Sequence, residues 1–222
     1  MKKIDVYKNG YKVFSQNFFK LKKSFLNEFE NIYKEKKFKS NHLNTAIIND
    51  LSSVDEYIET RRMFDEIIDV LKKNEYYDKL VFDDIWFIKS NKKTHTPKKL
   101  PFISHIDKIR KFKVMVYLND VKLKDGPINF TKINPDKYEL FRKNLKSNYK
   151  KKQKNRIIDI PKKNYTPLTG KFGTTIFFDS NTPHFAGKIT KLAAHRNVVR
   201  FNFRFKEKNN NNFFYNLIKK LI

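Results

Sequence analysis

The residues with the clearest capacity for chemistry are two histidines and one aspartate from separate parts of the chain. His105 and Asp107 form a His-x-Asp pair just before the apolar run Phe112–Leu118. In an extended segment, residues i and i+2 point to the same side, so this imidazole and carboxylate can hold one metal ion. His184 follows a second apolar run and a turn, and a sheet folded on itself would bring it to the same point. Two His and one carboxylate make a facial triad, which leaves positions on Fe(II) open for O₂ and a chelating co-substrate.

Each part of this set has an ordinary structural explanation when it is taken alone. A His-x-Asp pair most often belongs to a surface turn, and a His after a Pro, as at Pro183-His184, is usually structural. The order along the chain favours the metal site: the pair, a strand, a Gly-Pro turn, a Gly-led strand, a turn with His, and a strand with Arg. Because the chain has no cysteine, thiol catalysis, disulfides and sulfur-based zinc sites are excluded.

The elements that must position these residues change character near residue 81. Before it, apolar residues recur at helical spacing over 18–33, and a second helix is expected near Ser52 or Ser53, with Ser52 as its cap. After it come short runs of β character separated by turns, which favour a barrel or jelly roll over alternating βαβ units. The expected strands are 81–88, 112–118, 128–130, 172–178 and 198–205.

A single domain is expected from the length of 222 residues. Its expected parts are a helical support segment at 1–80, a β core at 81–207 with an insertion at 135–163, and an Asn-rich tether with an amphipathic helix at 208–222. The insertion holds an expected short helix at 135–149 and the Lys-rich run 150–156. That run is interpreted either as a solvated loop or as a lid or anion-binding loop.

The net charge of +26, from 49 Lys and Arg against 23 Asp and Glu, would suit nucleic acid or an anionic membrane as partner. However, only eight of the basic residues are Arg, the side chain with the fork geometry for phosphates, and the Lys are spread along the chain. A functional basic surface and A/T-rich coding composition explain the charge equally well. No apolar run reaches the roughly 20 residues of a membrane span, and the N-terminus lacks a signal-peptide pattern, so a cytoplasmic protein is expected.

The motifs together resemble those of the Fe(II)/2-oxoglutarate oxygenases of the phytanoyl-CoA dioxygenase-like family, over about residues 80–205. The first half of the resemblance is His105-Ile106-Asp107, the strand and acidic-Val step Val114–Val121, and the turn Asp125-Gly126-Pro127. The second half is the run Gly173–Asp179 leading into Thr182-Pro183-His184-Phe185-Ala186-Gly187, where the family has its distal His. The resemblance implies a mainly β fold with N-terminal helices and a double-stranded β-helix (jelly-roll) core.

By this resemblance, His105, Asp107 and His184 hold Fe(II), and 2-oxoglutarate chelates the same ion. The family also uses a basic residue after the distal His to pair with the far carboxylate of 2-oxoglutarate. Arg196, twelve residues after His184, fits that role, since an Arg fork can donate two parallel bonds to a carboxylate. Arg200 has the same strand parity and stays open as the alternative.

Other residues near these motifs have weaker assignments. Tyr117 either lines the 2-oxoglutarate pocket or is core. Thr174 and Thr175 are further candidates for hydrogen bonds to the co-substrate, and His195, of opposite parity to Arg196, is expected to be structural.

The implied reaction uses O₂ to decarboxylate 2-oxoglutarate oxidatively, with release of succinate and CO₂ and oxidation of a small-molecule substrate. Related halogenases have a small residue in place of the carboxylate, so Asp107 favours hydroxylation, with desaturation or ring formation as variants. The Lys-rich run would suit an anionic substrate. Two alternatives stay open: a basic nucleic-acid-binding protein, which gives no reason for the His-x-Asp, His and Arg series, and a superfamily oxygenase that modifies nucleic acid or protein.

Overall fold

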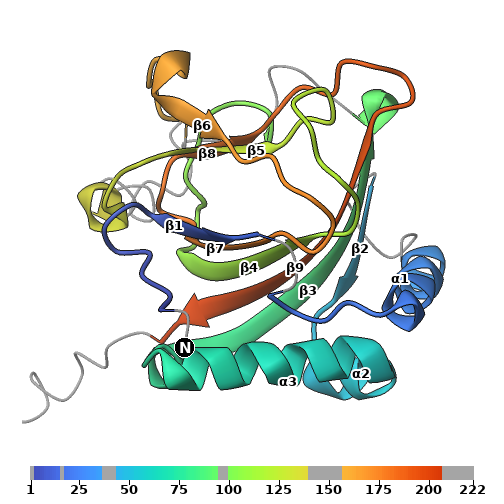
Figure 1. Cartoon of the computed structure of the whole chain (residues 1–222). Helices are drawn as coiled ribbons and strands as arrows, with labels where there is room; N and C mark the ends of the chain where they lie inside the picture. The colour runs from blue at the N-terminus through green and yellow to red at the C-terminus, as the bar shows by residue number, and fades with distance from the viewer. Residues whose placement is uncertain (1–2, 16–17, 37–43, 95–99, 140–156, 207–222) are drawn as a thin grey trace, which may run out of the picture.

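Two β-sheets face each other, and helices cover the far side of the larger sheet (Figure 1). The computed structural model describes residues 3–15, 18–36, 44–94, 100–139 and 157–206. The larger sheet has six strands in the order β1-β7-β4-β9-β3-β2, and the smaller has three in the order β6-β5-β8. The strands pair antiparallel within both sheets, so the core is the expected jelly roll.

The elements have the following bounds. The strands are β1 (Tyr11–Phe14), β2 (Thr45–Ile48), β3 (Leu80–Asn91), β4 (Lys111–Tyr117), β5 (Ile128–Thr131), β6 (Tyr165–Pro167), β7 (Thr175–Asp179), β8 (His184–Ala186) and β9 (His195–Phe205). The α-helices are α1 (Lys23–Lys36), α2 (Leu51–Asp55) and α3 (Ile58–Lys73). Short 3₁₀ turns lie at Tyr77–Lys79, Lys92–Thr94, Pro135–Tyr138 and Lys162–Asn164.

The outer face of the six-stranded sheet is a hydrophobic layer that holds the helices. Because side chains alternate along a strand, Val114 of β4 and Phe201 of β9 point outward. They join one buried cluster with Phe29 of α1 and Ile67 of α3, whose helical spacing gives each helix one apolar face. Burial of an aromatic side chain of this kind contributes about 1.5–3 kcal/mol to stability.

The inner face of the same sheet points at the three-stranded sheet and has a second, smaller core. Met115 and Tyr117 of β4, Phe178 of β7 and Val198 of β9 pack there with Phe130 of β5. Tyr117 is fully buried. This second core is the inside of the jelly roll, and the candidate metal-binding and co-substrate-binding residues lie around it.

The segment 1–80, expected as a helical support, contributes two strands to the larger sheet besides its helices. β1 pairs with β7, and β2 pairs with β3. Each of these strands is four residues long. The partner of β1 is distant in sequence, and the partner of β2 is the segment Ile85–Ile88 of the long strand β3. Such strands have too few residues to show a period-two pattern, so their pairing is decided by tertiary structure.

The predicted cap of the second helix is wrong. Asp50, not Ser52, is the N-cap residue of α2, and its side chain accepts a 2.7 Å hydrogen bond from the backbone N–H of Ser53. Asp is a strong N-cap residue because its oxygen satisfies an unpaired helical donor. The helix ends at Asp55, and α3 begins separately at Ile58.

The expected strands all exist, but their limits differ. β3 and β9 are longer than predicted, and β7 begins at Thr175 rather than near residue 172. Of the helix expected over 135–149, the structure describes a 3₁₀ turn at Pro135–Tyr138; residues 140–156, with the Lys-rich run 150–156, lie outside the described residues. The tether and helix expected at 208–222 also lie outside them.

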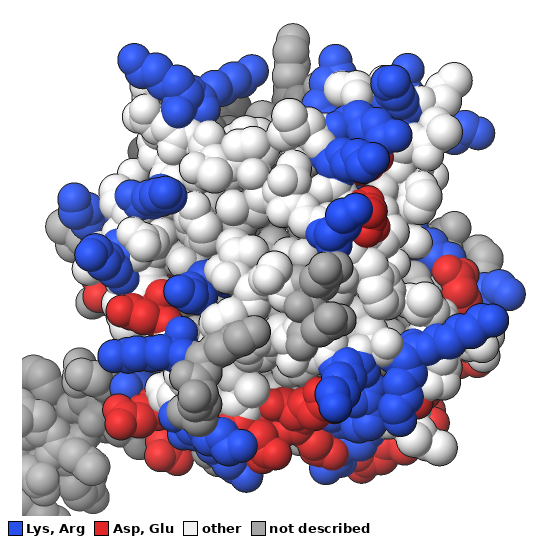
Figure 2. Space-filling view, in the orientation of Figure 1, with Lys and Arg blue, Asp and Glu red and all other residues white. Residues whose placement is uncertain are grey.

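On the face that Figure 2 shows, basic side chains are dispersed instead of gathered in one stripe. Figure 2 shows Lys and Arg scattered over the visible face, with Asp and Glu interspersed mainly in its lower part, where the helices lie in Figure 1. Among the described residues, no helix is both long and apolar enough to cross a membrane.

Candidate metal centre

The backbone brings His105 and His184 side by side across the jelly roll. The two residues form an antiparallel bridge in which each N–H donates to the other's carbonyl, at 3.1 and 2.9 Å. Residues paired in this way project their side chains to the same face, and the two ring centroids are 4.5 Å apart. Asp107 is fixed nearby because its N–H donates to the carbonyl of Ser180 at 3.1 Å.

Both imidazoles are oriented by their own backbone. The Nδ1 of His105 is 2.8 Å from the Ile103 carbonyl, and the Nδ1 of His184 is 2.8 Å from the Thr182 carbonyl. The Nε2 atoms therefore face Asp107, whose Oδ1 is 3.8 Å from that of His105 and 3.9 Å from that of His184. A carbonyl partner on one ring nitrogen is the usual way in which proteins orient a metal-binding His.

Burial keeps His184 in the neutral form that a metal ligand needs. Its ring stacks on Phe130, with centroids 5.5 Å apart, and meets the edge of Phe178 at 5.6 Å. This burial, together with the nearby His105, lowers the pKa of His184 to about 3.

Lys113 is a member of the site that the sequence analysis missed. Its ammonium group donates to Oδ2 of Asp107, which leaves Oδ1 directed at the two imidazoles. Burial lowers the pKa of Lys113 to about 8, with Arg200 acting in the same direction and Asp107 against it. The available signal was a charged residue inside an apolar strand, at the same parity as Met115 and Tyr117.

Asp107 is held ionised by its neighbours. Burial acts to raise the pKa of this carboxyl, but Lys113, His184 and His105 together outweigh it, so the pKa lies well below its usual range. An ionised carboxylate with one free oxygen is the form in which Asp binds a divalent cation.

Arg196 and Tyr117 lie together at another part of the inner face. Arg196 is buried, and its Nη1 donates to the carbonyl of Gly126. Gly126 has a positive φ of 67°, and a Cβ there would come within 2.5 Å of the Gly187 carbonyl oxygen, so this turn requires glycine. The Tyr117 hydroxyl donates to the Leu168 carbonyl at 2.8 Å, and burial raises the pKa of Tyr117 to about 12.

Arg200 lies on the same face of β9, opposite Met115 and Trp86 in the register. Its guanidinium carbon is 4.3 Å from the centroid of the Trp86 ring. The structure thus brings both candidate arginines, Arg196 and Arg200, to the inside of the jelly roll.

The remaining candidates lie away from the triad. Thr175 donates its hydroxyl to the Gly173 carbonyl at 3.3 Å, and its parity places it on the outer face with Phe177. His195 is exposed, as expected for a residue of opposite parity to Arg196. Thr174 lines a separate half-open pocket of about 300 Å³.

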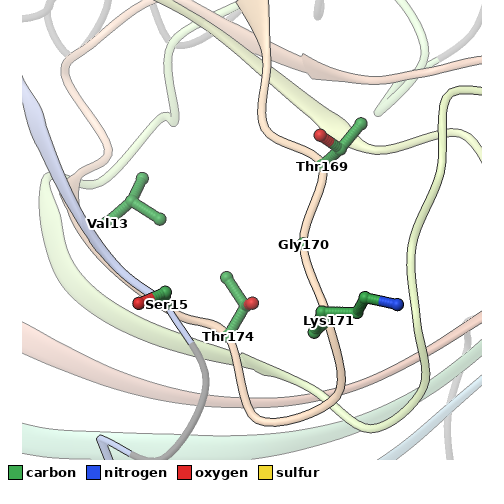
Figure 3. A pocket seen from close by; sticks show the side chains of 6 residues that line it. All are labelled: Val13, Ser15, Thr169, Gly170, Lys171 and Thr174. Atoms are coloured by element: carbon green, nitrogen blue, oxygen red, sulfur yellow. The ribbon is translucent and has the colours of Figure 1, made fainter.

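That pocket is formed by Val13, Ser15, Thr169, Gly170, Lys171 and Thr174 (Figure 3). It contains none of the triad residues. Its one charged side chain, Lys171, pairs with Asp120 at 3.0 Å. We therefore assign the pocket no chemistry.

The triad fits a divalent metal on its own geometry. One ligand atom each from His105, Asp107 and His184 lies within 4.8 Å of the others, and both imidazoles have their Nε2 atoms turned toward the carboxylate. Two nitrogens and one oxygen on one side of a site match a facial triad with open positions, the pattern typical of non-haem Fe(II).

Comparison with solved structures gives the same fold. The non-heme alpha ketoglutarate dependent carbocyclase SnoK from nogalamycin biosynthesis aligns with a TM-score of 0.58 at 12% identity, over 90% of this chain and 81% of SnoK. A prolyl 4-hydroxylase structure from Phytophthora capsici aligns with a TM-score of 0.58 at 15% identity, over 92% of this chain and 61% of that one. EvdMO1 gives a TM-score of 0.58 at 13% identity, over 90% of this chain.

These alignments show that this chain shares the fold of SnoK. This chain spans about half of the EvdMO1 chain, 48%. No protein-family model and no curated protein sequence matches the chain.

Proposed function

We propose that this protein is a non-haem Fe(II) and 2-oxoglutarate-dependent oxygenase that oxidises a small molecule, in the manner of the phytanoyl-CoA dioxygenase-like family. The observation that carries the proposal is the convergence of His105, Asp107 and His184 inside a jelly roll. The fold alone does not settle an activity, because one fold hosts many functions. The triad adds the chemistry. Two structures of this fold support the proposal: SnoK is a non-heme alpha ketoglutarate dependent carbocyclase, and the Phytophthora capsici protein is a prolyl 4-hydroxylase.

In this proposal, His105, Asp107 and His184 hold Fe(II). When bound, the ion together with 2-oxoglutarate and O₂ supplies the oxidising chemistry, with succinate and CO₂ as products. The protein's part is to fix the ligands before the metal arrives. The carbonyls of Ile103 and Thr182 orient the imidazoles, and Lys113 holds one oxygen of Asp107, so that the carboxylate offers its other oxygen alone.

Arg196 is the proposed anchor for the far carboxylate of 2-oxoglutarate. It is buried, and the one hydrogen bond it makes among the described residues is to the Gly126 carbonyl, so its other N–H donors remain for a ligand. A charge-assisted fork of this kind is strong and directional. Tyr117 lies beside it with its hydroxyl already engaged, so its ring supplies a wall of the co-substrate pocket rather than a proton.

Hydroxylation is the proposed outcome because Asp107 occupies the carboxylate position of the triad. A small residue there would leave space for a halide. Burial of both histidines keeps water away from the ligands, while Asp107 retains partial exposure, at 21% of its side chain, which marks the side from which a substrate reaches the site.

The test is conversion of 2-oxoglutarate to succinate by the purified full-length chain with Fe(II) and O₂, across a panel of metabolites. Wild-type protein is expected to form succinate, and Asp107→Ala to form none above background. Asp65→Ala, which removes an exposed carboxylate on α3, is the matched control and should retain full turnover. Retained turnover in Asp107→Ala would remove the metal assignment.

A further inference from the structure

The inner face of the sheet holds more buried positive charge than its acids neutralise. Lys113 and Arg196 are buried there, and Arg200 points to the same face. Asp107 is engaged by Lys113. Asp84, a carboxylate on β3, accepts hydrogen bonds from the Lys111 ammonium at 3.3 Å and from the Asn202 side-chain amide.

Arg200 is the least satisfied of these cations. Its Nε is fully buried and has no hydrogen-bond partner, and among the described residues Arg200 makes no ion pair. A buried donor left in this state is unfavourable, and a bound anion would satisfy it. The Trp86 ring, 4.3 Å away, holds the guanidinium plane in place without using its N–H donors.

Arg196 and Arg200 are spaced to bind two different groups. They are four residues apart on β9, which separates their Cα atoms by about 13 Å at roughly 3.3 Å per residue. Arg196 lies by Gly126 and Tyr117. Arg200 is opposite Met115, two residues along β4 from Lys113, and therefore lies on the part of the sheet next to Asp107.

We propose that Arg200, seated on Trp86 and supported by the charge of Lys113, binds an anionic group of the substrate, a carboxylate or a phosphate. This inference rests on the proposed function, because it assigns 2-oxoglutarate to Arg196. Once Asp107 and the two carboxylates of 2-oxoglutarate are set against a divalent ion and three cationic side chains, the site still has an excess of positive charge. A further anion beside the metal would neutralise that excess and satisfy the free edge of Arg200.

The test uses inorganic phosphate and acetate as probes of the two anion types, with Mn(II) and saturating 2-oxoglutarate on the full-length chain. Bound Mn(II) shortens the ³¹P or ¹³C nuclear relaxation time of an anion held next to it. The Asp107→Ala protein, which should not hold Mn(II), gives the background relaxation time. Arg200→Met is expected to lower the affinity for the faster-relaxing anion at least about tenfold. It should leave the affinity for 2-oxoglutarate within about twofold of wild type. Arg204→Met, an exposed arginine of the same strand paired with Asp83, is the control and should bind like wild type.

Arg200→Lys keeps the charge and guards against a folding defect, and it should retain part of the anion binding. Unchanged binding of both anions in Arg200→Met would overturn the proposal, as would a loss of 2-oxoglutarate affinity in that variant, which would make Arg200 the co-substrate anchor. Wild-type protein that binds neither Mn(II) nor 2-oxoglutarate would instead overturn the proposed function, and with it this assignment.

Discussion

The two faces of the six-stranded sheet are both buried, yet they are built from different chemistry. The outer face of β4 and β9 presents Val114, Val116, Phe201 and Phe203 to the helices. The inner face of the same strands presents Lys113, Arg196, Arg200 and Asn202, among others, beside its apolar residues. Alternation along a strand therefore separates a stabilising layer from a chemical one within a single element.

The difference shows where the fold accepts an energetic cost. Buried charges are expensive unless they are paired, and the buried Nε of Arg200 on the inner face has no hydrogen-bond partner. The outer face of β4 and β9 instead packs aromatic and aliphatic side chains against the helices. Substitutions on the outer face should consequently lower stability alone, whereas substitutions on the inner face should change the binding of metal or ligand.

The largest expected effect is on the outer face. Phe201→Ala removes a fully buried ring from the helix–sheet cluster and should lower the free energy of unfolding by about 3–5 kcal/mol. Urea unfolding followed by circular dichroism measures this. Folded Phe201→Ala protein should still bind 2-oxoglutarate, and a selective loss of that binding would show that the faces are not separable.

Lys113→Met tests the inner face next. It leaves Asp107 ionised without its partner and should destabilise the metal-free protein by about 2–3 kcal/mol, less than for a fully buried pair because Asp107 is partly exposed. Mn(II) should restore part of this loss, since the ion replaces the missing positive charge. Urea unfolding with and without Mn(II) measures both values, with the exposed Lys12→Met as control; an equal loss in both conditions would contradict the role of Lys113.

Arg196→Met should act on ligand affinity rather than on the fold. Loss of a charge-assisted fork is worth about 1.5–3 kcal/mol, so the Kd for 2-oxoglutarate should rise roughly 10- to 100-fold. Titration calorimetry on the metal-loaded protein measures it. A larger increase in Arg200→Met than in Arg196→Met would reverse the two assignments.

The smallest expected effect is a pH dependence of stability in the metal-free protein. The pKa of His184 is about 3 in the folded state against an ordinary 6.5, so between these values the unfolded chain binds more protons and stability falls as pH decreases. One such proton contributes at most about 1.4 kcal/mol per pH unit. His184→Asn should flatten the slope from pH 6 to 4, whereas His195→Asn, at an exposed site, should leave it unchanged.

The sequence predicts the parts of the site that depend on local geometry. His105 and Asp107 share a face because they are two residues apart, and His184 follows a strand that returns across the core. The long strands β4 and β9 were also recognisable, because their runs of apolar residues are long enough to indicate a strand. β1 and β2 were not, since four-residue strands exist only through their partners.

Lys113 and Arg200 show the limit of this approach. From sequence alone, a lysine in an apolar strand is expected to face solvent. Its burial follows only when both faces of the sheet are known to be covered. Arg196 and Arg200 have the same parity, so spacing alone does not distinguish them, and only the structure shows their different neighbours, Gly126 and Trp86.

The central claim is that the inside of the jelly roll holds one divalent ion through His105, Asp107 and His184. The most direct measurement is an oxygen-free calorimetric titration of Fe(II), with 2-oxoglutarate present, into wild type and the variants His105→Ala and His184→Ala. We predict one Fe(II) per wild-type chain and at least a tenfold loss of affinity in each variant. Wild-type protein that binds no Fe(II), or variants that bind it as tightly as wild type, would contradict the claim.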